Sequence, residues 1–169
     1  MVKLSISLIA IVLLLGCVSK KEKDLMQVYS EKSNYHKHLQ KTEKTQLYKN
    51  GVTQVMLTAT YLFRQNFKKK DTRDEVFIVG LHLEDESYKT FNTAKYNLTL
   101  NGKKPKEVKM LSVNDERLKD IPFVTESGSY YLITFPHEQS KDFMLLFESK
   151  SYGKGELHFA KRAKYVLSK

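Results

Sequence analysis

Most of the chain has a hydrophobic pattern with a period of two. From residue 51 onward, apolar side chains alternate with polar ones in short runs rich in Val, Ile, Thr, Tyr and Phe. This alternation is typical of β-strands with one buried face, because successive side chains of a strand point to opposite sides. The apolar positions of the successive runs are Val55, Leu57, Ala59, Tyr61 and Phe63; Phe77, Val79, Leu81 and Leu83; Tyr96, Leu98 and Leu100; Val108 and Met110; Tyr131, Ile133 and Phe135; Phe143, Leu145 and Phe147; and Leu157, Phe159, Ala163 and Tyr165.

Turn residues separate these runs. Residues 42–48 are a candidate first strand, and Asn50-Gly51 after them is the strongest hairpin signal in the chain. Residues 114–119 fit one helical turn, and no longer helical pattern follows residue 51. About seven or eight short strands are therefore expected, which favours a mainly β domain over residues 41–169, built as an antiparallel sandwich or barrel.

The segment before this domain is polar. Residues 18–50 are poor in branched apolar residues and rich in Lys, Glu, Ser, Gln and Thr. We expect residues 17–40 to be a tether with a short helix over residues 24–40, for which Asp24 is a candidate N-cap. The expected helix has one loose apolar stripe, formed by Leu25, Val28, Tyr29, Tyr35 and Leu39.

The start of the chain has the pattern of an export signal. A basic Met1-Val2-Lys3 precedes an apolar run from Leu4 to Leu15 that contains only two serines, and a strongly polar stretch begins at Ser19. An apolar run of about twelve residues matches the ~7–15 of a signal peptide and is shorter than the ~20 of a membrane-spanning helix.

The end of this run, Leu14-Leu15-Gly16-Cys17, resembles the lipobox of bacterial lipoproteins. The resemblance implies cleavage between Gly16 and Cys17, which makes residues 1–16 a signal peptide. It also implies a covalent lipid on Cys17, with diacylglycerol on the sulfur and an acyl chain on the freed amine, so that membrane lipid is the first partner. The alternatives are an uncleaved anchor and an ordinary signal peptide with a chance cysteine; Leu15 is bulkier than the usual Ala or Ser.

The same resemblance gives a location. An acylated Cys17 would anchor the protein in the cell envelope, facing the periplasm or the surface. Val18 follows the cysteine where well-studied Gram-negative bacteria use aspartate to retain lipoproteins in the inner membrane. By analogy, the outer membrane is favoured over the inner one.

One local pattern refines the fold class. The segment Glu126-Ser127-Gly128-Ser129-Tyr130-Tyr131-Leu132 resembles the entry to strand F of immunoglobulin-like domains, where a tyrosine hydroxyl bonds back to the preceding corner. Leu132 stands where antibody domains have a cysteine, and the chain has no tryptophan. The resemblance implies an Ig-like β-sandwich; the alternative is an ordinary turn followed by a strand.

Charge and composition narrow the function classes. The 169 residues include 29 Lys and Arg against 19 Asp and Glu, a formal net charge of +10. The single cysteine excludes an intrachain disulfide and a cysteine-cluster metal site. Nucleic acid is not an expected partner for an exported protein. The basic groups are Lys20, Lys21 and Lys23; Lys68, Lys69, Lys70 and Arg73; Lys103, Lys104, Lys106 and Lys109; and Lys161, Arg162 and Lys164.

These clusters have two interpretations. Lys20, Lys21 and Lys23 directly follow the proposed anchor, where each lysine near an anionic membrane surface contributes about 1 kcal/mol. A solvated face is the alternative for them. For the two loop clusters, solubility and the protection of sheet edges are the expected roles.

The sequence offers few candidates for catalysis or metal binding. It contains no Gly-rich phosphate loop, no HExxH and no G-x-S-x-G. His36 and His38 would share a face only on a strand, and they point ~200° apart on a helix. We therefore predict no catalytic site, no metal and no cofactor other than the lipid. The remaining candidates for such chemistry are His82, His137, His158, the acidic run Glu84-Asp85-Glu86, and Asp115-Glu116.

Three functions remain open. The first is a noncatalytic envelope lipoprotein whose sandwich binds an envelope protein, a glycan or the membrane surface. The second is a hydrolase of an envelope polymer. It needs a pocket in which two or more of these side chains converge: His82, His137, His158, Glu84 and Asp115. The third is a lysozyme inhibitor, which a strongly basic chain disfavours because lysozymes are basic as well.

Overall fold

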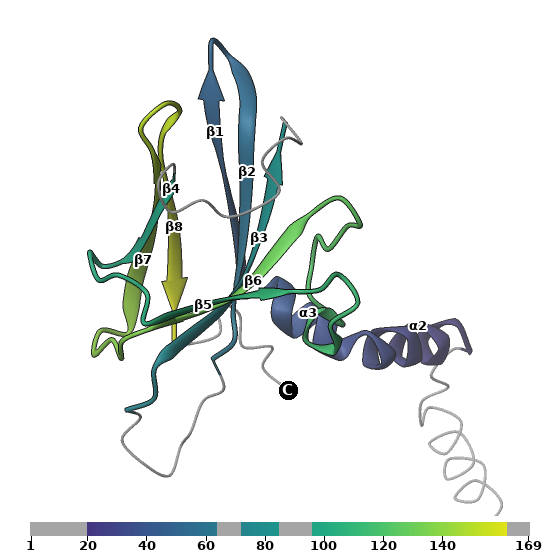
Figure 1. The fold of residues 1–169 in the computed structure, drawn as a ribbon. Helices are drawn as coiled ribbons and strands as arrows, with labels where there is room; N and C mark the ends of the chain where they lie inside the picture. The colour runs from purple at the N-terminus through teal and green to yellow at the C-terminus, as the bar shows by residue number, and fades with distance from the viewer. Residues whose placement is uncertain (1–19, 64–71, 85–95, 162–169) are drawn as a thin grey trace, which may run out of the picture. The chain divides into compact units, whose positions relative to one another are not determined.

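The computed structural model describes residues 20–63, 72–84 and 96–161 (Figure 1). Its described part is mainly β, as the alternating pattern predicts. Its elements, in chain order, are α2 (Lys20–Glu31), α3 (Ser33–Leu39), β1 (Thr42–Lys49), β2 (Val52–Tyr61), β3 (Glu75–Leu83), β4 (Tyr96–Leu100), β5 (Glu107–Leu111), the 3-10 helix η1 (Glu116–Leu118), β6 (Ser129–Phe135), β7 (Asp142–Ser149) and β8 (Gly153–Ala160).

The eight strands form two antiparallel sheets. The larger sheet has five strands in the order β1-β2-β3-β6-β5, and the smaller has three in the order β4-β7-β8. Without β1, this order equals the A-B-E-D and C-F-G sheets of an immunoglobulin constant-type sandwich. The predicted Ig-like antiparallel sandwich is therefore confirmed, with β1 as an additional strand at the edge of the larger sheet.

The main core lies between the two sheets, and it consists of the side chains that the alternating pattern places inward. Tyr61 packs at its centre, with ring centroids 4.9 Å from Phe77 and 5.1 Å from Phe143. Removing these side chains from water stabilises the fold at about 25 cal/mol per Å² of apolar surface. The buried members are Leu47, Val55, Leu57, Ala59, Tyr61, Phe77, Val79, Leu81, Tyr96, Leu98, Leu100, Tyr131, Ile133, Phe135, Phe143, Leu145, Phe147, Leu157 and Phe159.

A second, smaller core lies on the other side of the five-stranded sheet. The connection from β5 to β6 contains η1 and contributes Leu118 and Ile121, which pack with Ile78 and Tyr130 of the sheet. The predicted helical turn over residues 114–119 is confirmed by η1, whose N-cap Asp115 accepts a hydrogen bond from the Arg117 amide. The sequence pattern did not reveal that this connection would cover an outer sheet face.

The tyrosine motif is present, but its predicted location at the start of strand F is wrong. The Tyr130 hydroxyl accepts a 2.6 Å hydrogen bond from the Thr125 amide and donates one of 3.1 Å to the Thr125 carbonyl. The bond back to the corner therefore exists as expected. Tyr130 lies on β6, however, which pairs with β3 and β5 and so occupies the position of strand E rather than F. A local motif specifies the turn but not the neighbours of the strand that follows it.

The N-terminal segment is more helical than expected. Helix α2 begins at Lys20, so Asp24 lies inside it and is not its N-cap. The apolar side chains of its stripe, Leu25, Val28 and Tyr29, are exposed. The chain divides into two compact units, residues 1–33 and residues 34–169, so most of α3 belongs to the same unit as the sandwich. No helix among the described residues has both the length and the apolar character to span a bilayer.

Candidate functional site

The residues of the proposed lipid anchor lie outside the described part of the chain. This applies to Gly16 and Cys17. Lys20, Lys21 and Lys23 are in α2, and of these three side chains the structure describes that of Lys23, which is exposed. The contact of this cluster with lipid headgroups stays a prediction.

The histidines named as candidates have different surroundings. His36 and His38 lie on helix α3, so the strand geometry that would let them share a metal is absent. His137 Nδ1 donates a 2.8 Å hydrogen bond to the Arg73 carbonyl, whereas His158 is exposed and lies 3.9 Å from Glu156. Among the described residues, no group of three or more His, Cys, Asp or Glu side chains is placed to hold a metal ion.

His82 lies on the outer face of the five-stranded sheet, as its place in the alternation predicts. Its ring meets that of Tyr130 edge-on at 6.2 Å, and burial lowers its pKa. Its Nε2 is buried and makes no hydrogen bond with a described residue. Burial thus favours the neutral form of this ring.

The acidic candidates are at the surface. Glu84 is exposed, and Asp85 and Glu86 lie outside the described residues. The Asp115 carboxylate accepts hydrogen bonds from Arg117 Nε at 2.8 Å and from its terminal nitrogen at 2.5 Å. These side-chain hydrogen bonds lower the pKa of Asp115 to about 2 and raise the pKa of Arg117. The pair is therefore ionised at neutral pH and shapes the loop around η1.

A groove of about 800 Å³ lies beside α3. Its walls come from three segments far apart in sequence: α3 with the residue before β1, the end of β2, and the η1 connection. Ile78 of β3 contributes to the floor. We call this feature the α3 groove; its lining residues are Asn34, Lys37, His38, Lys41, Tyr61, Leu62, Phe63, Ile78, Glu116, Arg117, Lys119, Asp120 and Ile121.

Hydrogen bonds hold the walls of the α3 groove together. His38 Nδ1 lies 3.1 Å from the Asp120 carbonyl, and since a carbonyl only accepts, Nδ1 must donate. Thr42 Oγ1 donates to the His38 carbonyl at 2.8 Å, and Lys41 Nζ donates to the Phe63 carbonyl. Helix α3 is thereby connected to both the η1 loop and the end of β2, so the groove has fixed walls.

The α3 groove is basic over an apolar floor. Four lysine and arginine side chains line it, against the two carboxylates of Glu116 and Asp120. Leu62 and Phe63 are half-buried and form the accessible part of the floor. Two cations lie near the Phe63 ring, with Lys41 Nζ and the Arg73 guanidinium carbon each 5.7 Å from its centroid. The geometry suits a ligand with negative charge and some apolar surface.

A buried charge cluster lies next to the groove. The Glu75 carboxylate is 2% exposed and accepts hydrogen bonds from Lys161 Nζ at 2.6 Å, from the Glu138 amide at 2.9 Å, and from the Tyr61 hydroxyl. Lys161 also donates to the Glu138 carbonyl. A buried carboxylate needs such partners. The cluster therefore connects Lys161, which follows β8, to Glu75 at the start of β3.

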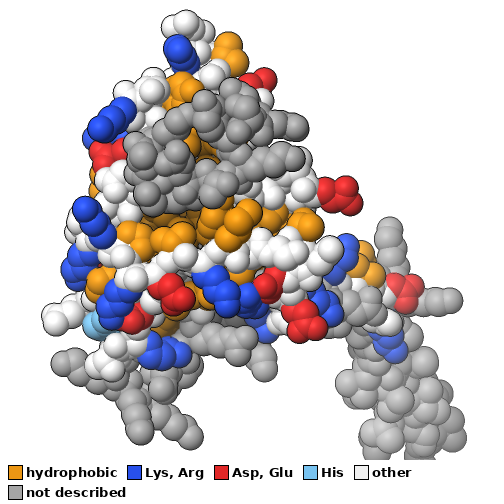
Figure 2. Space-filling view, in the orientation of Figure 1, with side chains coloured by type: hydrophobic (Ala, Val, Ile, Leu, Met, Phe, Trp, Pro, Cys, Tyr) orange, Lys and Arg blue, Asp and Glu red, His pale blue; other side chains and the backbone are white. Residues whose placement is uncertain are grey.

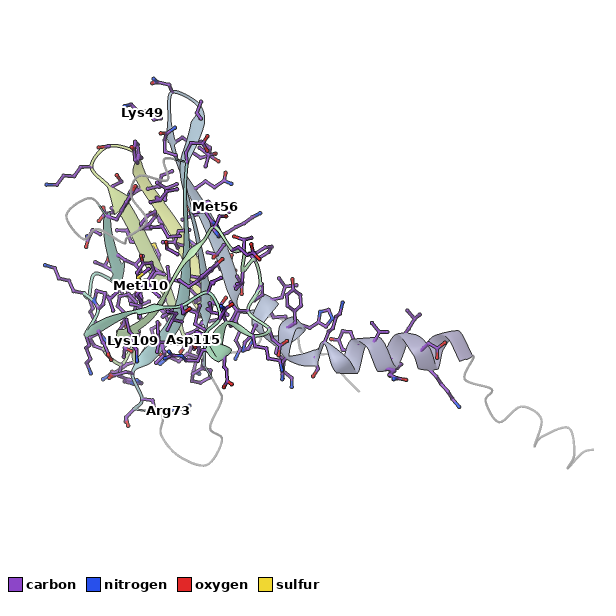
Figure 3. All side chains as sticks on the ribbon, turned by 45° about the vertical axis from the view of Figure 1, so that its right-hand side comes forward. Lys49, Met56, Arg73, Lys109, Met110 and Asp115 are labelled. Atoms are coloured by element: carbon purple, nitrogen blue, oxygen red, sulfur yellow. The ribbon has the colours of Figure 1, made fainter. Side chains whose placement is uncertain are left out.

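The edge strand β5 is the second surface of interest. Val108 and Met110 share the inner face of the sheet with Ile133 and Tyr131, yet they are 41% and 57% exposed. Figure 2 shows hydrophobic side chains across this face of the molecule, bordered by charged ones, and Figure 3 places Met110 and Lys109 on this strand. The basic cluster around residues 103–109 therefore flanks a sheet edge, the place where lysines discourage strand pairing.

Sequence reasoning missed the groove and the buried cluster. Lys37, Lys41 and Lys119 belong to no charge run, and Lys161 resembled one member of a solvated basic segment. The only available signal was Glu75, a carboxylate at the start of a strongly apolar strand, where a buried partner is required.

The fold and the groove define this protein as an Ig-like β-sandwich with a basic surface cavity. Comparisons with protein-family models, with curated proteins and with solved structures found no match.

Proposed function

We propose that the protein is a lipid-anchored lipoprotein of the bacterial cell envelope. In this proposal the β-sandwich is a noncatalytic binding or assembly module for an envelope partner. The observation that supports it most strongly is the sequence Leu14-Leu15-Gly16-Cys17, which places the only cysteine of the chain directly after an apolar run of signal-peptide length. Outer-membrane placement is proposed from Val18 after the cysteine.

The binding role is supported by the α3 groove. It is a concave, hydrogen-bonded surface feature with a surplus of positive charge, and such cavities are the usual places for ligands. The titratable candidates for hydrolysis have different partners: His137 bonds to Arg73, His158 lies beside Glu156, and Asp115 pairs with Arg117. A binding role needs no convergence of these groups.

Acylation is tested on the native protein. Mass spectrometry of the purified protein should find an N-terminal Cys17 with a diacylglyceryl thioether, and Cys17→Ser should shift the protein from the membrane fraction to the soluble fraction. Ser19→Ala is the matched control and should stay in the membrane. Retention of Met1 together with an unmodified sulfur would disprove the proposed anchor and its compartment.

The binding role is tested separately. Crosslinking in intact envelopes, followed by purification of the acylated protein, should recover a partner with the wild-type chain. Recovery of the same background as with an unrelated lipoprotein would disprove a protein partner.

A further inference from the structure

Two lysines of the α3 groove have ammonium groups that are available to a ligand. Arg117 is engaged by Asp115, and Lys41 donates to the Phe63 carbonyl. Lys37 and Lys119 are both exposed. Neither ammonium group takes part in an ion pair found among the described residues. Lys37 belongs to α3, and Lys119 directly follows η1. Lysine ammonium groups without a partner favour an anion such as phosphate.

The floor of the groove makes a simple inorganic anion a poor match. Leu62 and Phe63 present apolar surface beside the lysines, and Ile78 and Ile121 complete the floor. An anion with an attached apolar part would cover this surface and gain about 25 cal/mol per Å² in addition to its charge contacts. An amphiphile with a phosphate group combines both features.

The position of the groove along the chain favours a membrane source for this ligand. Lys37 is twenty residues after Cys17. Twelve of the intervening residues form α2, which at about 1.5 Å per residue spans only ~18 Å. A groove so close in sequence to an acylated cysteine stays within reach of the bilayer surface.

We propose that the α3 groove binds the phosphate headgroup of an anionic membrane lipid, with Lys37 and Lys119 as the charged contacts and Leu62 and Phe63 beneath the lipid's glycerol region. The proposal rests on the proposed function, because the anchor brings the sandwich to the bilayer. In this proposal the ligand of the β-sandwich is a lipid of the membrane that holds the anchor.

The test uses vesicles and a chain that cannot be acylated. The mature chain from residue 17, with Cys17→Ser, is mixed with vesicles of phosphatidylcholine or of phosphatidylcholine and phosphatidylglycerol, and the bound fraction is measured by sedimentation. The double variant Lys37→Gln/Lys119→Gln should bind the anionic vesicles about 30-fold more weakly, which corresponds to about 1 kcal/mol for each lysine at an anionic surface. Binding to the neutral vesicles should be weak for both chains.

A charge-matched control is necessary because the whole chain is basic. Lys49 is at the tip of the β1–β2 hairpin, and Figure 3 shows it at the opposite end of the sandwich from Asp115. Lys150 lies in the turn between β7 and β8. The variant Lys49→Gln/Lys150→Gln loses the same charge, but from hairpin turns at the far ends of β1 and β8, strands of eight residues that each span ~25 Å. Since the Debye length is only ~8 Å, its binding should fall less than about threefold.

Three results would overturn the proposal. The first is an equal loss of binding in the two double variants, which would show that net charge alone drives adsorption. The second is an absence of wild-type binding to anionic vesicles. The third is release of the protein by inorganic phosphate, but not by chloride at equal ionic strength, which would assign the groove to free phosphate. Because the assay uses an unacylated chain, its failure is distinct from failure of the lipid anchor.

Discussion

Lys161 lies 86 residues from Glu75 along the chain, yet its ammonium group is 2.6 Å from the Glu75 carboxylate. The lysine side chain is 13% exposed and the glutamate side chain 2%. The pair joins the residue after β8, in the three-stranded sheet, to the first residue of β3 in the five-stranded sheet. It therefore acts as a connection between the two layers of the sandwich at the end where β3 begins.

Removing the lysine should be strongly destabilising. Lys161→Met keeps most of the side-chain volume but removes the ammonium partner of the buried Glu75 carboxylate, which costs about 3–5 kcal/mol in comparable pairs. Urea unfolding followed by fluorescence or circular dichroism should show a lower midpoint with little change in slope.

The exposed pair Lys154–Glu156 provides the control. Lys154 lies 3.7 Å from Glu156, and both side chains are well exposed. Lys154→Met should change the free energy of unfolding by less than about 1 kcal/mol. A double variant, Lys161→Met with Glu75→Gln, should recover part of the loss because the unpaired charge is gone. Equal effects of Lys161→Met and Lys154→Met would contradict a structural role for the buried pair.

Tyr130→Phe tests the hydroxyl that closes the corner before β6. The variant removes both hydrogen bonds to the Thr125 backbone and leaves its amide unpaired, so we expect a loss of about 1–3 kcal/mol. Tyr48→Phe is the matched control, because the Tyr48 hydroxyl donates to the Gln46 side chain rather than to the backbone, and the residue is 51% exposed. Its loss should stay within about 0.5 kcal/mol. Thermal unfolding of the two variants under the same conditions gives both losses, and equal losses would contradict a structural role for the Tyr130 hydroxyl.

The inner faces of both sheets could be predicted because burial on one face imposes a period of two on the sequence. The alternation around Leu57, Val79, Ile133 and Leu145 marked the core correctly. The position of β6 could not be predicted from Tyr130, because the corner is a contact over five residues whereas the sheet order depends on pairing partners distant in sequence. A local signal thus specifies local geometry only.

The candidate groove was not predictable for a related reason. His38 and Asp120 are 82 residues apart, and each is an unremarkable polar residue in its own segment. The basic clusters visible in the sequence drew attention to residues 103–109, where the charges flank an edge strand. The groove instead gathers single lysines, such as Lys37 and Lys119, that only the folding of three segments brings to one cavity.

Gly155→Ala tests the contact between β1 and β8, which lie at the edges of different sheets. A Cβ atom at Gly155 would overlap Thr45 Oγ1 and would lie 2.9 Å from Thr45 Cγ2. The two strands would have to separate, so the free energy of unfolding should fall by about 1–3 kcal/mol. In a Thr45→Ala background the nearest side-chain atom is Cβ, at 3.0 Å, and the cost of Gly155→Ala should be smaller. An unchanged cost in that background would mean that this contact is not the cause.

His82 should make the stability of the sandwich sensitive to mild acid. Burial lowers its pKa in the folded protein, whereas an unfolded histidine titrates near pH 6.5. Above that pH the ring is neutral in both states and has no effect on the pH dependence. As the pH falls below about 6.5, the unfolded chain binds a proton that the folded chain resists, so the free energy of unfolding decreases until the pH passes the lowered pKa.

His82→Leu removes this titration, so the variant should lose less stability than the wild type between about pH 7.5 and pH 5. His158→Leu is the matched control, because it also removes one histidine but the His158 side chain is 72% exposed. Urea unfolding at a series of pH values gives the slope for each chain. If the wild type and His82→Leu show the same slope, the neutral buried ring is not a source of acid sensitivity, and the loss must come from groups such as the carboxylates that pair with Lys103 and Lys106.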